Sequence, residues 1–102
     1  MSFYEVQYAR AALVDIEEAV NYYEQRRSGL GLRFAEAVLE KVAAIATNPF
    51  HSRIGYDQIH CAKVNIFPYL IHYSVERDKS VVTIEAVWNT WRQPLWEHSG
   101  EE

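Results

Sequence analysis

The feature of this sequence that most restricts its fold is a change in the spacing of its apolar residues. From about Ala9 to Thr47 they recur every three or four positions, whereas from Phe67 to Trp88 they alternate with polar ones. The first spacing is typical of amphipathic helices and the second of half-buried strands. Because the helical part precedes most of the β part, the order indicates an α+β fold rather than repeated βα units.

The helical part reads as two helices, over about 9–26 and 30–47. Between them, "RRSGLG" breaks the pattern, and Gly29 or Gly31 suits the left-handed residue that follows a helix end. Asn48-Pro49 ends the second helix. So short a link predicts an antiparallel hairpin. The expected core stripes are Leu13, Ile16, Val20 and Tyr23 in the first helix and Phe34, Val38, Val42 and Ile45 in the second.

The β part begins with an irregular stretch, 51–60, which we interpret as a loop carrying a short strand. Strands over about 67–76 and 82–88 then form an antiparallel hairpin closed by "ERDKS". Pro68 marks a strand start, a bulge or an edge position. Trp88 falls in the apolar phase of its strand, which predicts packing in the core.

The expected architecture is therefore α+β. A short N-terminal strand over 3–8 precedes an antiparallel helical hairpin, which packs on one face of a small antiparallel β-sheet, and a short C-terminal segment follows. With 102 residues the chain predicts a single domain, 1–102.

Charge and composition bear on localisation and partners. The net charge is −4, and the ten basic residues are scattered, which disfavours strong autonomous binding to nucleic acid. No apolar run is long enough to span a membrane, and the N-terminus lacks the pattern of a signal peptide. The single cysteine, Cys61, cannot form an internal disulfide. We therefore expect a cytoplasmic protein with no membrane partner.

Several stretches, taken together in this order, resemble the RelE/ParE superfamily of toxins from type II toxin–antitoxin modules, known also as plasmid stabilisation proteins. They extend over about residues 4–96 and are "DIEEAVNYYEQ", "GLGLRFAEAV", "NPF", "FPYLIHYSV" and "AVWNTWRQPLW". The resemblance implies a bacterial growth inhibitor neutralised by a cognate antitoxin, whose C-terminal segment wraps around the toxin. ParE-like members bind and poison DNA gyrase, whereas RelE-like members are ribosome-dependent mRNA interferases.

The C-terminal motif favours the ParE-like branch. RNA cleavage by attack of a 2′-hydroxyl needs a base, an acid and cations beside the developing charge. Relatives often carry a His where this chain has Asn89, and RelE-like nucleases carry a Tyr about where it has Trp96. Because neither an amide nor an indole transfers protons near neutral pH, we expect a toxin that is not an enzyme.

Two alternatives remain open. A RelE-like nuclease would use the retained Arg92 with Lys63 and a histidine, His60 or His72, as its catalytic residues. A degenerate, non-toxic member would only bind its antitoxin or regulate its operon, a reading motivated by the acidic charge.

For the favoured reading, the target-binding residues are Arg92, Trp91, Asn89 and Trp96. Aromatic residues beyond a strand end often form interfaces, although Arg92 could instead pair with Glu85 or Glu97, and Trp96 could fold back over the sheet. His51, His60, Cys61 and His72 lack a metal-ligand spacing, and no phosphate-binding loop is present, so we expect no metal and no cofactor.

Overall fold

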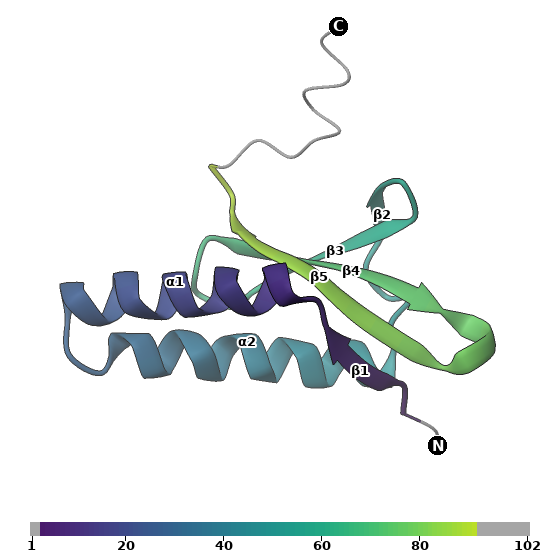
Figure 1. Ribbon diagram of the computed structural model, residues 1–102, viewed down its shortest axis with the longest axis horizontal. Helices are drawn as coiled ribbons and strands as arrows, with labels where there is room; N and C mark the ends of the chain where they lie inside the picture. The colour runs from purple at the N-terminus through teal and green to yellow at the C-terminus, as the bar shows by residue number, and fades with distance from the viewer. Residues whose placement is uncertain (1–2, 92–102) are drawn as a thin grey trace, which may run out of the picture.

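The computed structural model describes residues 3–91, in which two helices are followed by most of a five-stranded sheet (Figure 1). The predicted α+β architecture is confirmed. The elements are β1 (Glu5–Tyr8), α1 (Arg10–Arg26), α2 (Leu30–Thr47), β2 (Ile54–Tyr56), β3 (Ile59–Lys63), β4 (Tyr69–Glu76), a short 3-10 helix (Arg77–Lys79) and β5 (Val81–Asn89).

The strands are ordered β1-β5-β4-β3-β2. The pairs β2–β3, β3–β4 and β4–β5 are antiparallel, as expected for strands joined by short connections. β1 differs from the antiparallel sheet expected, because it pairs parallel to β5. The helical hairpin and three strands separate β1 from β5 in sequence, and a connection of that length permits the parallel arrangement.

The two helices form the expected antiparallel hairpin, and the turn between them depends on Gly29. This residue has φ +89°, a left-handed conformation that glycine adopts without the steric cost of a Cβ. The Glu24 carboxylate accepts hydrogen bonds from the backbone N–H groups of Gly29, at 2.9 and 3.1 Å, and Gly31, at 3.0 Å. Because the first N–H groups of a helix lack intrahelical acceptors, Glu24 caps α2 from the preceding helix.

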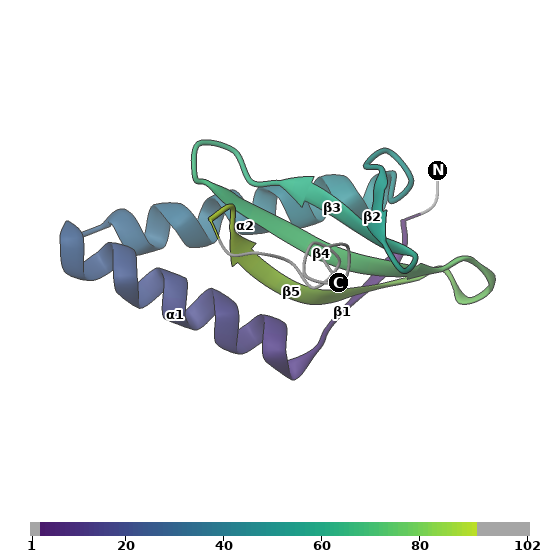
Figure 2. The same cartoon turned by 90° about the horizontal axis from the view of Figure 1, so that it is seen from above.

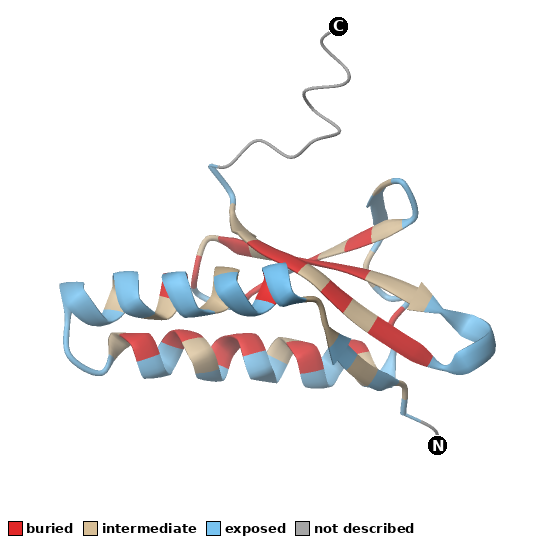
Figure 3. Cartoon of the chain, viewed as in Figure 1, coloured by how far each residue is buried: buried red, intermediate tan, exposed pale blue. Residues whose placement is uncertain are grey.

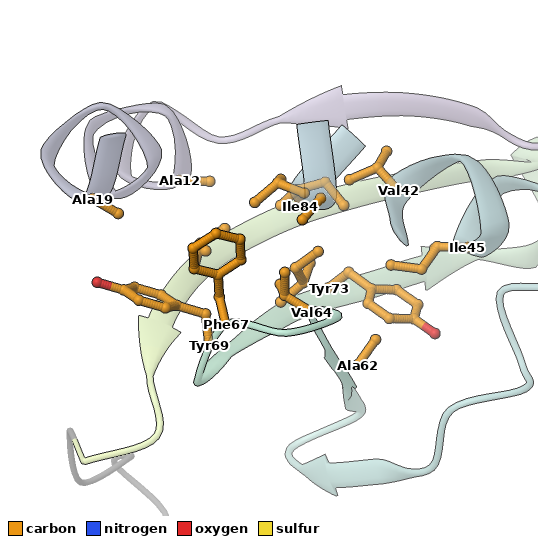
Figure 4. Packing of buried hydrophobic residues seen from close by; sticks show 14 of the residues in the cluster. Ala12, Ala19, Val42, Ile45, Ala62, Val64, Phe67, Tyr69, Tyr73 and Ile84 are labelled. Carbon is orange, nitrogen blue, oxygen red and sulfur yellow. The ribbon is translucent and has the colours of Figure 1, made fainter. Parts of the chain in front are cut away.

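The core lies between the hairpin and one face of the sheet, as Figures 3 and 4 show. The predicted stripe of α2 is buried throughout. In α1 the prediction for Leu13 was wrong, since that side chain is 52% exposed, and Ala12 and Ala19 are buried instead. The small side chains of these alanines let the helix backbone approach the sheet closely, so α1 is rotated relative to the stripe of large residues.

A bulge in the sheet overturns the prediction for Trp88. The register shifts so that Tyr73 opposes Ile84 while His72 opposes Ala86, which leaves Glu85 as an extra residue. Beyond this point the phase of β5 is reversed, and Val87 rather than Trp88 joins the core. Trp88 therefore lies on the opposite face of the sheet, where its ring contacts that of His72, with centroids 4.8 Å apart.

Among residues 3–91 no helix covers that second face, and we call it the open face. In Figure 2, β3, β4 and β5 lie in front of α2 when the molecule is seen from above. The cross-strand registers place these side chains on the open face: Cys61, Lys63, Leu70, His72, Ser74, Thr83, Ala86 and Trp88. Within residues 3–91, neither helix is long and apolar enough to cross a membrane.

Candidate functional site

The C-terminal end of β5 carries two of the predicted target-binding residues. Asn89 is the last residue of the strand and lies opposite Tyr69 of β4. Its Oδ1 accepts a hydrogen bond from the backbone N–H of Trp91 at 3.1 Å, and the N–H of Thr90 donates to the carbonyl of Pro68 at 2.8 Å. These bonds fix the turn after the strand and leave the Trp91 side chain 76% exposed.

The environment of Asn89 is one of hydrogen bonding, not of proton transfer. Burial raises the pKa of the Tyr69 phenol, and a side-chain hydrogen bond with Asn89 opposes that shift as a smaller cause. The amide therefore contacts both the strand opposite and the turn that follows. Because an amide neither gains nor loses a proton near neutral pH, this position supplies no general acid or base.

The other two predicted target-binding residues, Arg92 and Trp96, lie outside the described residues. In the sequence, Arg92 directly follows the exposed Trp91.

The structure does not bring Lys63 and His60 together, although both belong to β3. They are three positions apart in a strand, so their side chains leave opposite faces. The Lys63 ammonium lies near the β3–β4 loop, where it donates at 2.9 Å to the carbonyls of Val64 and Phe67. The loop itself thus engages this cation.

His60 lies on the helix side of the sheet and is 7% exposed. Its ring stacks on that of Tyr73, with centroids 5.1 Å apart, and its Nδ1 lies 2.6 Å from the carbonyl oxygen of Ser52. Since a carbonyl only accepts, Nδ1 carries the hydrogen in this bond. These contacts give His60 a packing role beneath the 51–53 loop.

Sequence reasoning named His72 only as an alternative base and did not foresee its neighbours. On the open face, His72 is 1% exposed, with the Tyr56 hydroxyl 3.2 Å and the Cys61 Sγ 3.6 Å from its Nδ1. Burial raises the pKa of the Cys61 thiol, which disfavours the reactive thiolate. In the strands "IHCAK" and "LIHYS", Cys61 lies directly opposite His72, so the pairing of β3 with β4 puts these two side chains on the same face of the sheet.

A groove of about 460 Å³ between α1 and the end of β5 was also not foreseen. We call it the α1–β5 groove. From α1 it is lined by Asp15, Glu18, Ala19, Tyr22, Tyr23 and Arg26, and from the sheet by Tyr69, Val87, Trp88, Asn89 and Trp91. The α1 residues lie three, four, seven, eight and eleven positions after Asp15, which is the pattern of one helix face and is readable in the sequence. The rotation of α1 decides that this face is directed towards β5.

Asp15 connects the two walls of this groove. Its Oδ2 accepts a hydrogen bond from the backbone N–H of Val87 at 3.0 Å. β1 covers β5 only as far as Ile84, so Val87 has no strand on that side among the residues described. The carboxylate therefore satisfies a donor at an edge that the sheet leaves uncovered.

For metals, residues 3–91 hold no cluster of three or more His, Cys, Asp or Glu side chains with suitable geometry.

Comparison with solved structures defines the fold class. The chain has a TM-score of 0.74 to a chain of the chromosomal ParDE system of P. aeruginosa, at 11% identity, covering 85% of this chain and 96% of that one. The TM-score to a chain of the RelBE2 toxin–antitoxin complex of Mycobacterium tuberculosis is 0.67, at 18% identity, covering 87% of this chain and 93% of that one. The TM-score to the isolated RelE toxin of E. coli is 0.61, at 19% identity, covering 96% of each chain. The fold is therefore that of RelE/ParE-like toxins.

The particular family follows from the sequence. A family model described as the ParE toxin of type II toxin–antitoxin systems, parDE, matches residues 6–94. The chain belongs to this family, as the resemblance predicted. No curated protein matches the chain.

Proposed function

We propose that this chain is the toxin of a type II toxin–antitoxin module, neutralised by a cognate antitoxin, and that it inhibits growth by binding DNA gyrase without hydrolytic chemistry of its own. Membership of the ParE toxin family supports the class of activity. The surface proposed to contact the target is the end of β5, namely Asn89 and Trp91 with the Arg92 and Trp96 that follow in sequence.

The chemistry of Asn89 carries this proposal. The resemblance aligns it with a position that is often His in the family, and its Oδ1 accepts a hydrogen bond from the Trp91 N–H. Trp91 is exposed beside it, and a large exposed aromatic side chain is a frequent anchor of protein interfaces. A rigid turn that presents an aromatic side chain suits recognition better than acid–base catalysis.

The open face gives further support. Among the side chains that the registers of β3, β4 and β5 place there, Lys63 is the single cation, and its ammonium donates to two backbone carbonyls. Glu85 adds negative charge there, accepting a hydrogen bond from the Ser74 hydroxyl at 2.8 Å. Binding of an RNA backbone depends on several Lys or Arg contacts to phosphate, so this face is poorly suited to mRNA.

One observation favours the RelE-like interferase as a second candidate. Lys63 and His72 share the open face, so a cation and an imidazole lie on one side of the sheet. In that case the residues acting on the RNA would be Lys63, His72 and Arg92. Because His72 is buried, the side chains around it would have to move before RNA could reach its ring.

Induced expression in bacteria is the first test. The expected result is growth arrest that is relieved by co-expressing the product of the adjacent gene. Unaffected growth would contradict both toxin readings and favour the degenerate, non-toxic alternative.

Purified gyrase then separates the two toxin readings. We expect inhibition of supercoiling or accumulation of cleavage complexes as the protein is titrated, and Trp91→Ala should require at least about tenfold more protein for the same effect. Phe3→Ala is the matched control, because it also removes an exposed aromatic side chain but precedes β1, which pairs with the other end of β5, from Val81 to Ile84. Normal gyrase activity, with mRNA cut in phase with codons on translating ribosomes, would establish the alternative instead.

A further inference from the structure

Ile66, in the loop between β3 and β4, has a backbone conformation that suits its side chain poorly. Its φ is +75°, in the left-handed region where a Cβ crowds the following carbonyl oxygen. The other described residues with positive φ are glycine or polar residues, namely Gly29, Asp57, Gln58 and Ser80. A β-branched residue in this region is a backbone outlier, and holding it there costs the fold stability.

Packing does not compensate for this strain. The Ile66 side chain is 82% exposed, the largest value among the exposed large apolar side chains of residues 3–91. A single exposed apolar side chain needs no explanation by itself, because such side chains are common on protein surfaces. Strain and exposure at the same residue do need one, since this isoleucine weakens the fold without filling its core. Strained residues of this kind cluster at functional sites.

The rest of the loop holds Ile66 in place from both sides. The Lys63 ammonium donates at 2.9 Å to the carbonyls of Val64 and Phe67, which precede and follow Ile66 in the loop. The Val64 N–H donates to the Tyr69 carbonyl at 2.9 Å, and the Tyr69 N–H donates to the Phe67 carbonyl at 2.8 Å. The side chains of Val64 and Phe67 are buried in the core. The loop is therefore preorganised, and a partner that binds Ile66 loses little free energy in ordering it.

The same loop lies beside the surface proposed to contact the target. The Thr90 N–H donates to the Pro68 carbonyl at 2.8 Å, so the loop and the turn after β5 are joined directly. Figures 1 and 2 both show the loop between β3 and β4 next to the end of β5. Ile66 lies two residues before Pro68, and the exposed Trp91 directly follows Thr90. Two exposed apolar side chains are thus presented by adjoining turns at one end of the sheet.

From these features we infer that Ile66 is a second anchor for the target, and that its aliphatic side chain enters an apolar pocket of gyrase next to the contact made by Trp91. The inference rests on the proposed function, which supplies gyrase as the target, and adds a contact from a different loop. Binding anchors cluster near the centre of an interface, which fits a pair formed by Ile66 and Trp91. The strain at position 66 then persists because it presents the side chain that the target binds.

Ile66→Asn tests the inference through two effects of opposite sign. Asparagine adopts the left-handed conformation more readily than isoleucine, so the substitution relieves strain and should raise the melting temperature by at least about 2 °C. It also removes the apolar anchor, so the protein concentration that gives half of the full effect on purified gyrase should rise at least about tenfold. A residue with only a structural role would not give a more stable fold together with a weaker toxin.

Two matched variants serve as controls. Ile54→Asn makes the same change at another exposed isoleucine, in β2, which β3 and β4 separate from β5 and which has no positive φ. We expect it to change the effect on gyrase less than about twofold and not to raise the melting temperature. Ile66→Val keeps both the strain and most of the apolar side chain, and should stay within about fivefold of the unsubstituted chain.

The outcomes separate the inference from the proposed function. An unchanged effect of Ile66→Asn on gyrase, with a weaker effect of Trp91→Ala, would overturn the second anchor and leave gyrase as the target. A lower melting temperature for Ile66→Asn would show that Ile66 stabilises the fold, and would overturn the inference whatever the gyrase result. No effect of the unsubstituted chain on gyrase would overturn the proposed function and the inference with it.

A second measurement tests whether the contact is direct. A photo-crosslinking phenylalanine derivative at position 66 should capture a subunit of purified gyrase, and the same derivative at exposed position 54 should not. The same reactions are run with the purified product of the adjacent gene added. Crosslinks from position 66 only to that product, or only to a second copy of this chain, would assign the loop to that partner and contradict the inference.

Discussion

At the scale of single residues, Gly31 sets the distance between the two helices. A Cβ built at this position would lie 2.6 Å from the carbonyl oxygen of Val20 and 3.0 Å from the Cβ of Glu24. The first of these neighbours is helix backbone, which cannot move without displacing its own hydrogen bonds. The close approach of α1 and α2 therefore requires glycine for its lack of a side chain.

We expect Gly31→Ala to lower the free energy of unfolding by about 1–2 kcal/mol. Alanine gains up to about 1 kcal/mol in helix propensity, but overpacking against backbone costs typically about 1–3 kcal/mol. The cost of overpacking is the larger of the two, so the net effect is destabilising. Urea denaturation followed by circular dichroism measures the difference. Leu32→Ala, at the exposed neighbouring position, should change stability by less than about 0.5 kcal/mol. An increase in stability for Gly31→Ala would mean that the helices separate at little cost.

Glu24 carries a second prediction at this scale. Its carboxylate accepts hydrogen bonds from the N–H of Gly29, the N-cap of α2, and from the N–H of Gly31 in the first turn of that helix. Glu24→Ala should cost about 1–2 kcal/mol, the usual value for losing a helix cap. Glu17→Ala, on the exposed side of the same helix, serves as the control in the same denaturation experiment. If both substitutions had the same small effect, the turn would be held by packing rather than by the carboxylate.

At the scale of elements, the sequence was sufficient for the helices and only partly for the strands. The expected helices, 9–26 and 30–47, agree with α1 and α2 to within a residue, because Gly29 and Asn48-Pro49 end the helical periodicity sharply. β3 was largely missed. Its core-facing side chains are His60 and Ala62, and Cys61 and Lys63 face the other way, so the strand lacks the contrast in polarity that alternation requires.

The candidate site was predictable in its position along the chain but not in its surroundings. Asn89 and Trp91 lie at the end of β5 as expected. The reversal of phase that moves Trp88 to the open face could not be predicted, because apolar alternation continues through Ala86 to Trp88 and the bulge exists only relative to β4. The groove depends in the same way on the rotation of α1, which Ala12 and Ala19 decide against the larger Leu13.

The docking of α1 on β5 gives a prediction at this scale. Asp15→Ala leaves the Val87 N–H without its acceptor at a partly buried edge, which should destabilise the fold by about 1–3 kcal/mol. Glu18→Ala, one turn further along, removes no such bond and should change stability by less than about 0.5 kcal/mol. Chemical denaturation of the two variants measures both values. Equal stability would indicate that water or a neighbouring group replaces the carboxylate.

At the scale of the whole molecule, the two faces of the sheet differ in what they can do. The helix side is closed by the hairpin and packed with aromatic rings, among them Tyr23, Phe34, Phe67 and Tyr69 with centroids 4.8–6.1 Å apart. The open face has no helix over it among residues 3–91, and the adjoining end of β5 carries the exposed Trp91. In a chain this short, the helix-side core supplies the stability, so surface substitutions at the site can be tested without unfolding the protein.

The phenols in that core predict how stability depends on alkaline pH. Burial is the largest cause raising the pKa of Tyr73 and of Tyr69 above the ordinary value of about 10. The folded state therefore keeps these protons at pH values where the unfolded chain releases them. Their contribution is complete below about pH 10 and is lost as the pH rises from there towards the folded-state pKa, at up to about 1.4 kcal/mol per pH unit for each group.

Tyr73→Phe isolates one of these groups. The Tyr73 side chain is fully buried and its hydroxyl donates to the carbonyl of Pro49 at 2.7 Å, so the substitution should cost about 1 kcal/mol at pH 8. Between pH 9.5 and pH 11 the variant should lose less stability than the unsubstituted chain, since it has no Tyr73 proton to release on unfolding. Urea denaturation across this range measures both curves, with absorbance at 295 nm following ionisation of the phenols. Parallel curves would mean that the Tyr73 proton is equally held in both states and that burial is not what governs the alkaline limit of the fold.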